Sequence, residues 1–180
     1  METISIDQLR YPTGKFSFNS TAGEKEVKQC IEAIEQHPSL LRKAVKGLND
    51  AQLDTPYRDG GWTVRQVVHH LADSHMNAYT RFKLALTEEH PSIKPYDENA
   101  WANLDDAKHL SVEISLSLLE PLHIRWAHML KRIQLADYSK TVFHPESKRD
   151  MSVLFLFQLY AWHGKHHTAH ITSLRQRQGW

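Results

Sequence analysis

The sequence predicts an all-α protein, a four-helix bundle with an extended N-terminal arm. Three observations predict this class. Apolar residues recur at helical spacing in four long segments, no segment makes a credible sheet, and 180 residues suit a single domain. Each apolar stripe must be buried against a partner, and a bundle of four helices provides one for every stripe. We therefore expect residues 1–180 to form one domain.

The composition is that of an ordinary globular protein, and it narrows the choice of partner. A net charge of +1 gives no strong field to hold nucleic acid or an anionic membrane. The chain start lacks the features of a secretory signal, and no apolar run approaches the ~18 residues of a membrane span. A single cysteine, Cys30, excludes an intrachain disulfide and is expected only to pack. The sequence thus predicts a cytoplasmic protein with a small-molecule partner, and neither nucleic acid nor membrane.

The N-terminal part of the chain changes from arm to helix near residue 24. Residues 1–22 show weak periodicity and are interpreted as the extended arm. From Glu24 to Leu48 the apolar residues follow one face of a helix. We expect Pro38 to kink or split this first helix, because proline lacks the N–H of the helical hydrogen bond.

The second helix has a clear start signal. Thr63 and Gln66 fit a capping box, in which each side chain accepts a hydrogen bond from the other residue's backbone N–H. The helix is expected to run from Thr63 to about Thr87. Two His-Pro and Lys-Pro steps then break the pattern, and residues 91–103 are predicted to form a loop.

The third and fourth helices follow. A heptad-like apolar pattern predicts a helix over about 105–136, with a kink at Pro121. The polar segment after it contains a short potential strand at 141–143. The last helix is predicted over 152–176 from its apolar stripe.

Histidine is the unusual residue, at 13 of 180. Seven of the histidines fall on two predicted helices. They are His69, His70 and His75 on the second, and His163, His166, His167 and His170 on the fourth.

His163 and His167 are the strongest candidates for metal ligands. They are four residues apart on one helical face, and they continue the apolar stripe into the bundle. Each buried, unpaired ring nitrogen costs roughly 1–3 kcal/mol, and a bound metal removes that cost. His166 and His170 have the same spacing but lie at the edge of the stripe. They are an alternative ligand pair, supporting residues, or exposed.

A third ligand is expected from the second helix, and spacing alone leaves His69, His70 and His75 open. His75 lies nearest the centre of its apolar stripe, so we expect it to be a core histidine bonded to a neighbour. A bundle that uses imidazoles only as core hydrogen-bonding groups, or a pH-sensitive core, explains the same pattern without a metal.

The segment from Gln52 to His75 resembles the DinB/YfiT superfamily of metal-binding four-helix bundles, and the resemblance covers most of the chain. It rests on Trp62-Thr63 followed by His70-Leu71-Ala72-Asp73, on Pro95-Tyr96-Asp97-Glu98, and on Trp162-His163 through His170-Ile171. In that superfamily one histidine of the Trp-containing helix joins two from the last helix. The resemblance therefore implies the metal ligands His70, His163 and His167.

The resemblance also implies a function and an assembly. It implies one divalent metal ion per subunit, with Zn²⁺ ahead of Ni²⁺, in a homodimeric metal-dependent hydrolase. Three neutral imidazoles leave the charge of the ion undiminished, so that it can activate water against a small substrate. Related bundles transfer thiols such as bacillithiol, and the same ligands would activate a thiol. A non-catalytic metal-binding stress-response bundle is the alternative from another class.

Residues near the implied ligands receive weaker assignments. Asp73 is a candidate catalytic residue that orients a histidine or carries a proton, with a purely structural carboxylate as the alternative. Trp62, Tyr57 and Arg58 are candidates to line the substrate pocket, with Arg58 reading an anionic group. Residues 97–98 are expected in a loop that covers the site.

Overall fold

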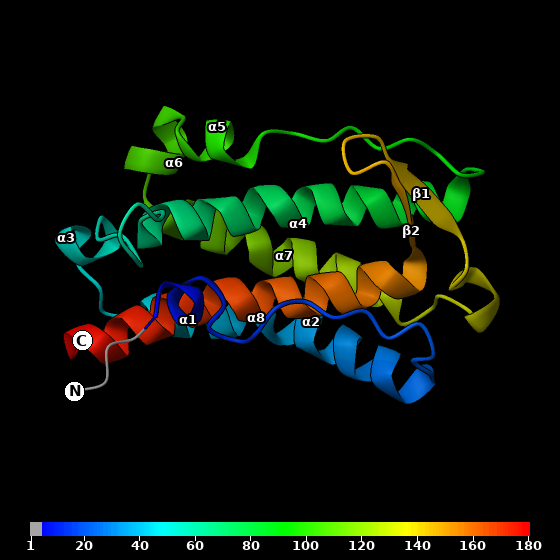
Figure 1. The fold of residues 1–180 in the computed structure, drawn as a ribbon, viewed down its shortest axis with the longest axis horizontal. Helices are drawn as coiled ribbons and strands as arrows, with labels where there is room; N and C mark the ends of the chain where they lie inside the picture. The colour runs from blue at the N-terminus through cyan, green and yellow to red at the C-terminus, as the bar shows by residue number, and fades with distance from the viewer. Residues whose placement is uncertain (1–4) are drawn as a thin grey trace.

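The structure, a computed structural model that describes residues 5–180, is built around four long helices (Figure 1). These are α2 (Glu24–Val45), α4 (Val64–Thr87), α7 (Val112–Leu130) and α8 (Val153–Gln178). The shorter helices are α1 (Ile6–Arg10), α3 (Asp50–Leu53), α5 (Glu98–Ala102), α6 (Asp105–His109) and the 3-10 helix η1 (Leu135–Asp137). The predicted four-helix bundle is confirmed.

The four helices are arranged so that α2 and α4 each pack against both α7 and α8. Residues 37 and 44 of α2 contact residues 168 and 175 of α8, so these two helices run parallel. Contacts of residues 69 and 75 with 115 and 123 show that α4 and α7 also run parallel. The diagonal pairs of the bundle are therefore α2 with α4 and α7 with α8, whereas α4 and α7 are neighbours.

This topology explains the long connection over residues 88–111. Because α4 and α7 are parallel, the chain must return along the bundle before α7 can begin. The connection does so on the outer side of α4, and α5 and α6 lie near its end (Figure 1). Part of the predicted loop 91–103 is thus helical, and the connection becomes a wall beside α4.

The helix starts that carry capping signals lie where the sequence predicts them. Thr63 Oγ1 accepts the Gln66 N–H at 3.1 Å and Gln66 Oε1 accepts the Thr63 N–H at 2.9 Å. Ser152 Oγ caps α8 by accepting the Phe155 N–H at 3.1 Å. The predicted ranges 63–87 and 152–176 agree with α4 and α8 to within two residues.

The predicted third helix, 105–136, is wrong in its bounds. The segment splits into α6 and α7, because the Ser111 hydroxyl accepts the Glu113 N–H and so caps a new helix. The helix ends at Leu130, before η1 starts with the Gln134 N–H donating to Asp137 Oδ2.

A small sheet corrects the expectation of an entirely helical chain. Strands β1 (Thr141–His144) and β2 (Arg149–Ser152) pair antiparallel. The potential strand at 141–143 is therefore real, and its partner β2 was not predicted. The predicted arm also contains α1, and residues 1–4 of that arm lie outside the described residues.

Both prolines lie inside continuous helices. The helix α2 continues through Pro38 without splitting, and α7 continues through Pro121. Since proline has no N–H, the carbonyl four residues before Pro38 has no partner within its helix. That carbonyl belongs to Ile34 and is buried in the bundle.

The apolar core forms two clusters. One contains Phe82, Trp126 and Phe157, and the other contains Leu41, Leu71 and Leu119. Along each long helix, buried histidines lie between the residues of one cluster and those of the other, and so they occupy the middle of the bundle. Among residues 5–180 no helix is both long and apolar enough to cross a membrane.

Candidate metal centre

Each of the four long helices contributes histidine to the middle of the bundle. The side chains form two groups of three, which we call the open triad and the closed triad. The open triad is His70, His163 and His167, and the closed triad is His37, His75 and His123. In each group every residue offers a ligand atom within 4.8 Å of the other two.

The open triad unites the three residues that the resemblance implies as ligands. His70 is buried, while His163 and His167 are partly exposed. The Nε2 atoms of His70 and His163 lie 3.3 Å apart. Two ligands at zinc–nitrogen distances of about 2.0–2.1 Å in a tetrahedral site are separated by about 3.3 Å. The spacing of the two nitrogens therefore suits a metal ion between them.

The electrostatic state of the open triad suits a cation. Burial lowers the pKa of His70 to about 4. Burial, and then the neighbouring histidines, hold the pKa values of His163 and His167 well below the ordinary value. All three rings are thus neutral near pH 7, and a neutral imidazole is the form that binds metal. Among residues 5–180, no hydrogen-bond partner satisfies the buried Nδ1 of His167.

The other candidates on the two helices point elsewhere. The ring nitrogens of His69 lie 2.7 Å from Ser115 Oγ and 3.1 Å from the Leu110 carbonyl oxygen. His166 and His170 contact each other, with their Nε2 atoms 3.1 Å apart. Of the three histidines that spacing left open on the second helix, His70 lies with both His163 and His167, whereas His75 belongs to the closed triad and approaches His163 Nδ1 at 3.4 Å.

Trp62 forms a wall of the open triad, but Tyr57 and Arg58 lie further away. The Trp62 ring is 4.6 Å from that of His70, centroid to centroid, and is nearly parallel to that of His167 at 6.2 Å. Tyr57 stacks on His170 at 3.9 Å, and the Arg58 guanidinium lies 5.2 Å from the centre of the Tyr57 ring. Of the three predicted pocket residues, one directly contacts the open triad.

Asp73 is a partly buried carboxylate without an orienting bond to the triad. Its side chain makes no hydrogen bond to His70 or to any other residue in the range 5–180. Burial, and then the nearby Asp106, raise the pKa of Asp73 to about 6. The carboxyl group can therefore exchange a proton near neutral pH, whereas the orienting role lacks a contact.

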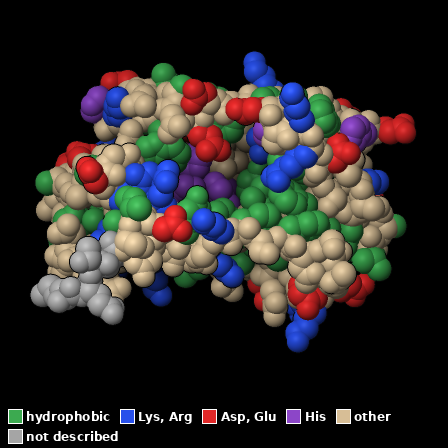
Figure 2. All heavy atoms as spheres, in the orientation of Figure 1, with side chains coloured by type: hydrophobic (Ala, Val, Ile, Leu, Met, Phe, Trp, Pro, Cys, Tyr) green, Lys and Arg blue, Asp and Glu red, His purple; other side chains and the backbone are tan. Residues whose placement is uncertain are grey.

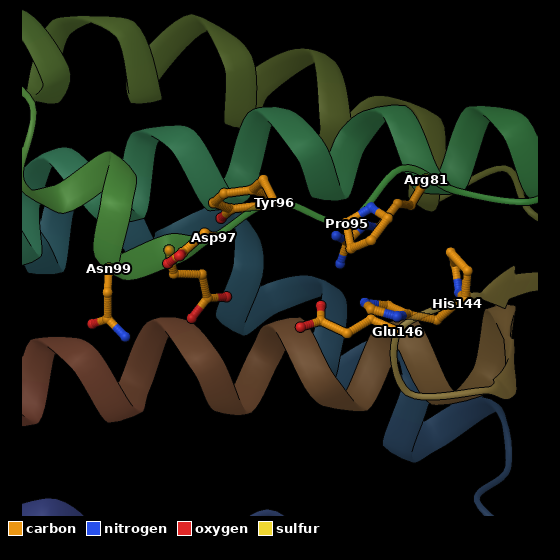
Figure 3. A pocket seen from close by; sticks show the side chains of 9 residues that line it. Arg81, Pro95, Tyr96, Asp97, Asn99, His144 and Glu146 are labelled. Carbon is orange, nitrogen blue, oxygen red and sulfur yellow. The ribbon is translucent and has the colours of Figure 1, made fainter.

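A hollow on one face of the molecule has histidine side chains on its floor and charged side chains around it (Figure 2). A cavity of about 750 Å³ lies between the 88–111 connection, α4 and the β1–β2 turn (Figure 3). It is lined by Arg81, Pro95, Tyr96, Asp97, Glu98, Asn99, His144, Pro145 and Glu146. Residues 97–98 thus border this cavity, but Asp97 caps α5 and Glu98 begins it, so the segment predicted as a loop is partly helical.

The cavity is connected to the open triad through one hydrogen bond. Arg81 Nη1 donates to the Tyr160 hydroxyl at 2.9 Å, and the Tyr160 ring lies 6.1 Å from that of His163. Arg81, His144 and Glu146 were not predicted as site residues. No motif marks them, and two of the three come from a hairpin whose position depends on tertiary packing.

The closed triad differs from the open triad in burial and in hydrogen bonding. Its members His37, His75 and His123 are only 3%, 1% and 1% exposed. His75 Nδ1 lies 2.9 Å from His123 Nε2, and His123 Nδ1 lies 2.6 Å from the Ile34 carbonyl oxygen. The prediction that His75 is a core histidine bonded to a neighbour is confirmed. His37 and His123 were missed as members of a cluster.

Known proteins are similar to this chain in sequence and in fold. A protein of Bacillus cereus named "Putative metal-dependent hydrolase" is 54% identical over 97% of this chain and 100% of its own length. A Bacillus mycoides protein of the same description is 55% identical over the same shares. The solved structure of YfiT from Bacillus subtilis, described as "a probable metal-dependent hydrolase with an unusual four-helix bundle topology", is 48% identical. It matches with a TM-score of 0.94 over 96% of this chain and 99% of that one.

The family assignment follows from these matches and from a family model. Residues 33–171, which contain both triads and all four long helices in whole or part, match the DinB superfamily. The match covers most of the chain and agrees with the bundle described above. The chain belongs to the DinB superfamily.

Proposed function

We propose that this chain is a metal-dependent hydrolase of a small substrate, with one divalent ion held by His70, His163 and His167. The observation that carries the proposal is the convergence of three neutral imidazoles, with two Nε2 atoms 3.3 Å apart, beside a hollow in the surface. The names of the relatives support it. Zn²⁺ is the first choice of ion and Ni²⁺ the second, since imidazole suits both.

When bound, a zinc ion held by three neutral ligands keeps its full charge and acidifies a coordinated water. The residues of the chain supply the rest of the site. Trp62 covers His70 and shields it from solvent. Asp73, with its pKa near 6, is the candidate proton carrier. Arg81, on the way from the cavity to the triad, offers a cation to an anionic part of the substrate.

The metal content of the purified protein tests the ligand assignment. Protein purified without added metal is expected to contain about one equivalent of zinc or nickel, measured by mass spectrometry. His70→Ala and His163→Ala should lose it. His166→Ala is the matched control, because His166 lies on the same helix but bonds to His170, and it should keep the metal. A full complement of metal in folded His163→Ala overturns the assignment.

Activity panels then test the reaction. Metal-loaded protein should hydrolyse a member of an ester and amide panel, and chelation should abolish the activity. Consumption of a thiol together with an electrophile, without any hydrolysis, would move the assignment to thiol transfer. Metal-loaded protein that is inactive in both panels would favour the non-catalytic metal-binding bundle.

The homodimer stays a prediction. Apolar side chains on α7 are exposed in the single chain, among them Ile114 and Leu118, four residues apart on one face. Sedimentation at micromolar concentration should give twice the chain mass of 20.9 kDa. A monomer at these concentrations would contradict this prediction without affecting the metal site.

A further inference from the structure

The carbonyl of Ile34 has an unusual partner. In a regular α-helix it would accept the N–H of residue 38, but residue 38 is proline and has none. It accepts instead from His123 of α7, whose Nδ1 lies 2.6 Å away. A proline defect in α2 is thus paired with a histidine from another helix.

This bond determines which nitrogen of His123 carries the proton. A carbonyl oxygen only accepts, so Nδ1 of His123 must be the donor. The ring is neutral, because burial lowers the pKa of His123 to about 4, and its Nε2 therefore has a free lone pair. His75 Nδ1, 2.9 Å from that lone pair, must then be protonated and donate to it.

The same reasoning extends to the open triad. With its proton on Nδ1, neutral His75 has a lone pair on Nε2. His163 Nδ1 lies 3.4 Å from this atom and is the donor that completes the contact. A neutral His163 with its proton on Nδ1 has its lone pair on Nε2, the atom 3.3 Å from His70 Nε2.

We propose that the Ile34 carbonyl, freed by Pro38, fixes the tautomer of His163 through His123 and His75, so that the His163 Nε2 lone pair faces the open triad. His75 and His123 are positioning residues in this account. They take the part that a carboxylate or a backbone carbonyl takes when it bonds directly to a metal-binding histidine. The use of the lone pair for a metal rests on the proposed function, while the tautomer itself does not.

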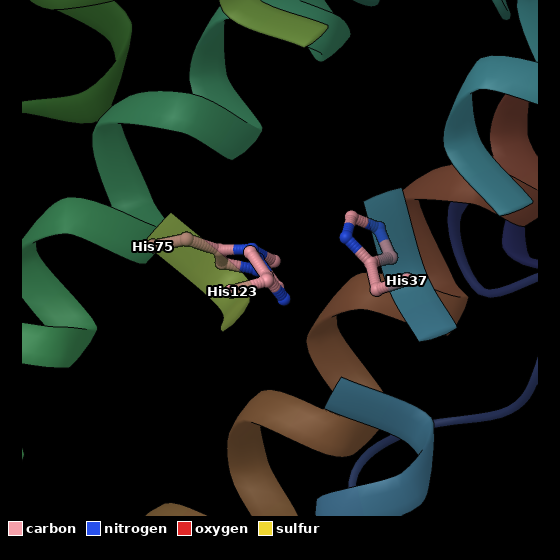
Figure 4. A group of neighbouring side chains, drawn as sticks. All are labelled: His37, His75 and His123. Atoms are coloured by element: carbon pink, nitrogen blue, oxygen red, sulfur yellow. The ribbon is translucent and has the colours of Figure 1, made fainter. Parts of the chain in front are cut away.

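The alternative for the closed triad is a second metal site, and proton positions argue against it. Figure 4 shows His37 facing the His75–His123 pair, and the His37 ring is 4.9 Å from that of His75. A metal on His75 Nδ1 would move the proton of that ring to Nε2, where it would point at His163 Nδ1. His163 would then carry its own proton on Nε2 and lose the lone pair that faces His70. Occupation of the closed triad would therefore disable the open one.

The tautomer of His163 in metal-free protein tests the proposal directly. Nitrogen NMR of the histidine rings should show His163 protonated on Nδ1 in the wild-type protein. In His123→Phe, which keeps a ring but removes both bonds, a substantial fraction of His163 should move its proton to Nε2. The matched control is His37→Leu. His37 is nearly as buried as His123, and among residues 5–180 its ring bonds to Thr168 and to neither His75 nor His123, so His163 should be unchanged.

Metal affinity supplies the second readout. By competition with a chromophoric chelator, His123→Phe should bind Zn²⁺ about 10–100-fold more weakly, and His37→Leu within about 3-fold of wild type. Wild-type His163 protonated on Nε2 overturns the proposal even if no variant folds, and so does an unchanged tautomer in folded His123→Phe. Absence of zinc binding by the wild type, with the tautomers as expected, would contradict the proposed function but not the inference that the Ile34 carbonyl fixes the tautomer of His163.

Discussion

The open and closed triads each contain three histidines whose ligand atoms lie within 4.8 Å of one another, but their ring nitrogens are engaged differently. In the open triad the Nε2 atoms of His70 and His163 face each other across 3.3 Å. In the closed triad His75 and His123 are hydrogen-bonded to each other, and His123 also to a backbone carbonyl. Proximity of three histidines is thus a poor criterion for a metal site. The availability of their lone pairs is a better one.

The two triads also differ in burial. The closed triad lies within the bundle at 1–3% exposure, whereas two members of the open triad are partly exposed. An ion in the closed triad would be enclosed by side chains that are only 1–3% exposed, and desolvation of a dication is expensive. The difference implies that the open triad binds the metal ion, whereas the closed triad positions His163.

The largest expected effect is acid destabilisation through the closed triad. Burial lowers the pKa of His37 to about 3 and that of His123 to about 4, while unfolded histidine titrates near 6.5. Above pH 6.5 neither state is protonated, and stability is complete. As pH falls from 6.5 towards 4, these histidines are protonated in the unfolded state but not in the folded state. The free energy of unfolding therefore falls by about 1.4 kcal/mol per pH unit for each histidine.

Urea unfolding of metal-free protein at several pH values measures this loss, which should reach several kcal/mol at pH 4.5. His37→Leu should make the slope shallower by about one proton. A stability that is flat between pH 6.5 and 4.5 would show that these rings bind protons as readily in the folded state as in the unfolded one, and it would contradict the lowered pKa values.

Gly164 should matter to the closed triad alone. A Cβ at this position would lie 2.7 Å from Cδ2 of His37, so Gly164→Ala should cost roughly 1–3 kcal/mol through overpacking. In a His37→Ala background the same change should stabilise by up to about 1 kcal/mol, because alanine is the better helix former. Chemical unfolding of the four proteins of this cycle measures the coupling. Equal effects in both backgrounds would mean that His37 does not pack against Gly164.

The substitution Asp73→Asn tests the role of the carboxylate assigned to the site of the open triad. Its pKa of about 6 means that ionisation is unfavourable in the folded state, so stability is reduced above pH 6 and not below pH 4. The variant should gain about 1 kcal/mol at pH 8, after allowance for partial exposure, and nothing at pH 4. A gain in stability with lost turnover is expected of a functional carboxylate. Unchanged turnover would remove Asp73 from the mechanism.

Pro38→Ala should produce the smallest effect. Alanine at position 38 has a backbone N–H that can donate to the Ile34 carbonyl. That carbonyl oxygen would then accept two hydrogen bonds, one from its own helix and one from His123. Zinc affinity should fall by about 2–5-fold, with stability unchanged or slightly higher. Pro121→Ala is the control, because no histidine bonds to the Ser117 carbonyl among the described residues. Equal effects of the two variants would argue against a special role for Pro38.

The sequence predicted what local signals encode. The α4 and α8 helices begin at Thr63 and Ser152 because their side chains cap the first turn, and caps depend on neighbouring residues alone. The break at Ser111 carries the same signal but was hidden by an apolar pattern that continued past it. The strand β2 depends on pairing with β1 and has no independent signature.

In the candidate site, too, the features within one helix could be predicted from the sequence, whereas those that depend on packing between helices could not. Spacing of four along α8 was enough to bring His163 and His167 together, because both lie on one helix. The choice of His70 over His69 required knowledge of which way α4 faces α7 and α8. The closed triad combines three helices, and its one local clue is the proline four residues after Ile34.

The central claim is that only the open triad holds an ion, and anomalous diffraction from crystals grown with excess Zn²⁺ tests it most directly. The account predicts one zinc peak per chain, in contact with His70, His163 and His167. A peak among His37, His75 and His123, alone or together with the first, would contradict it.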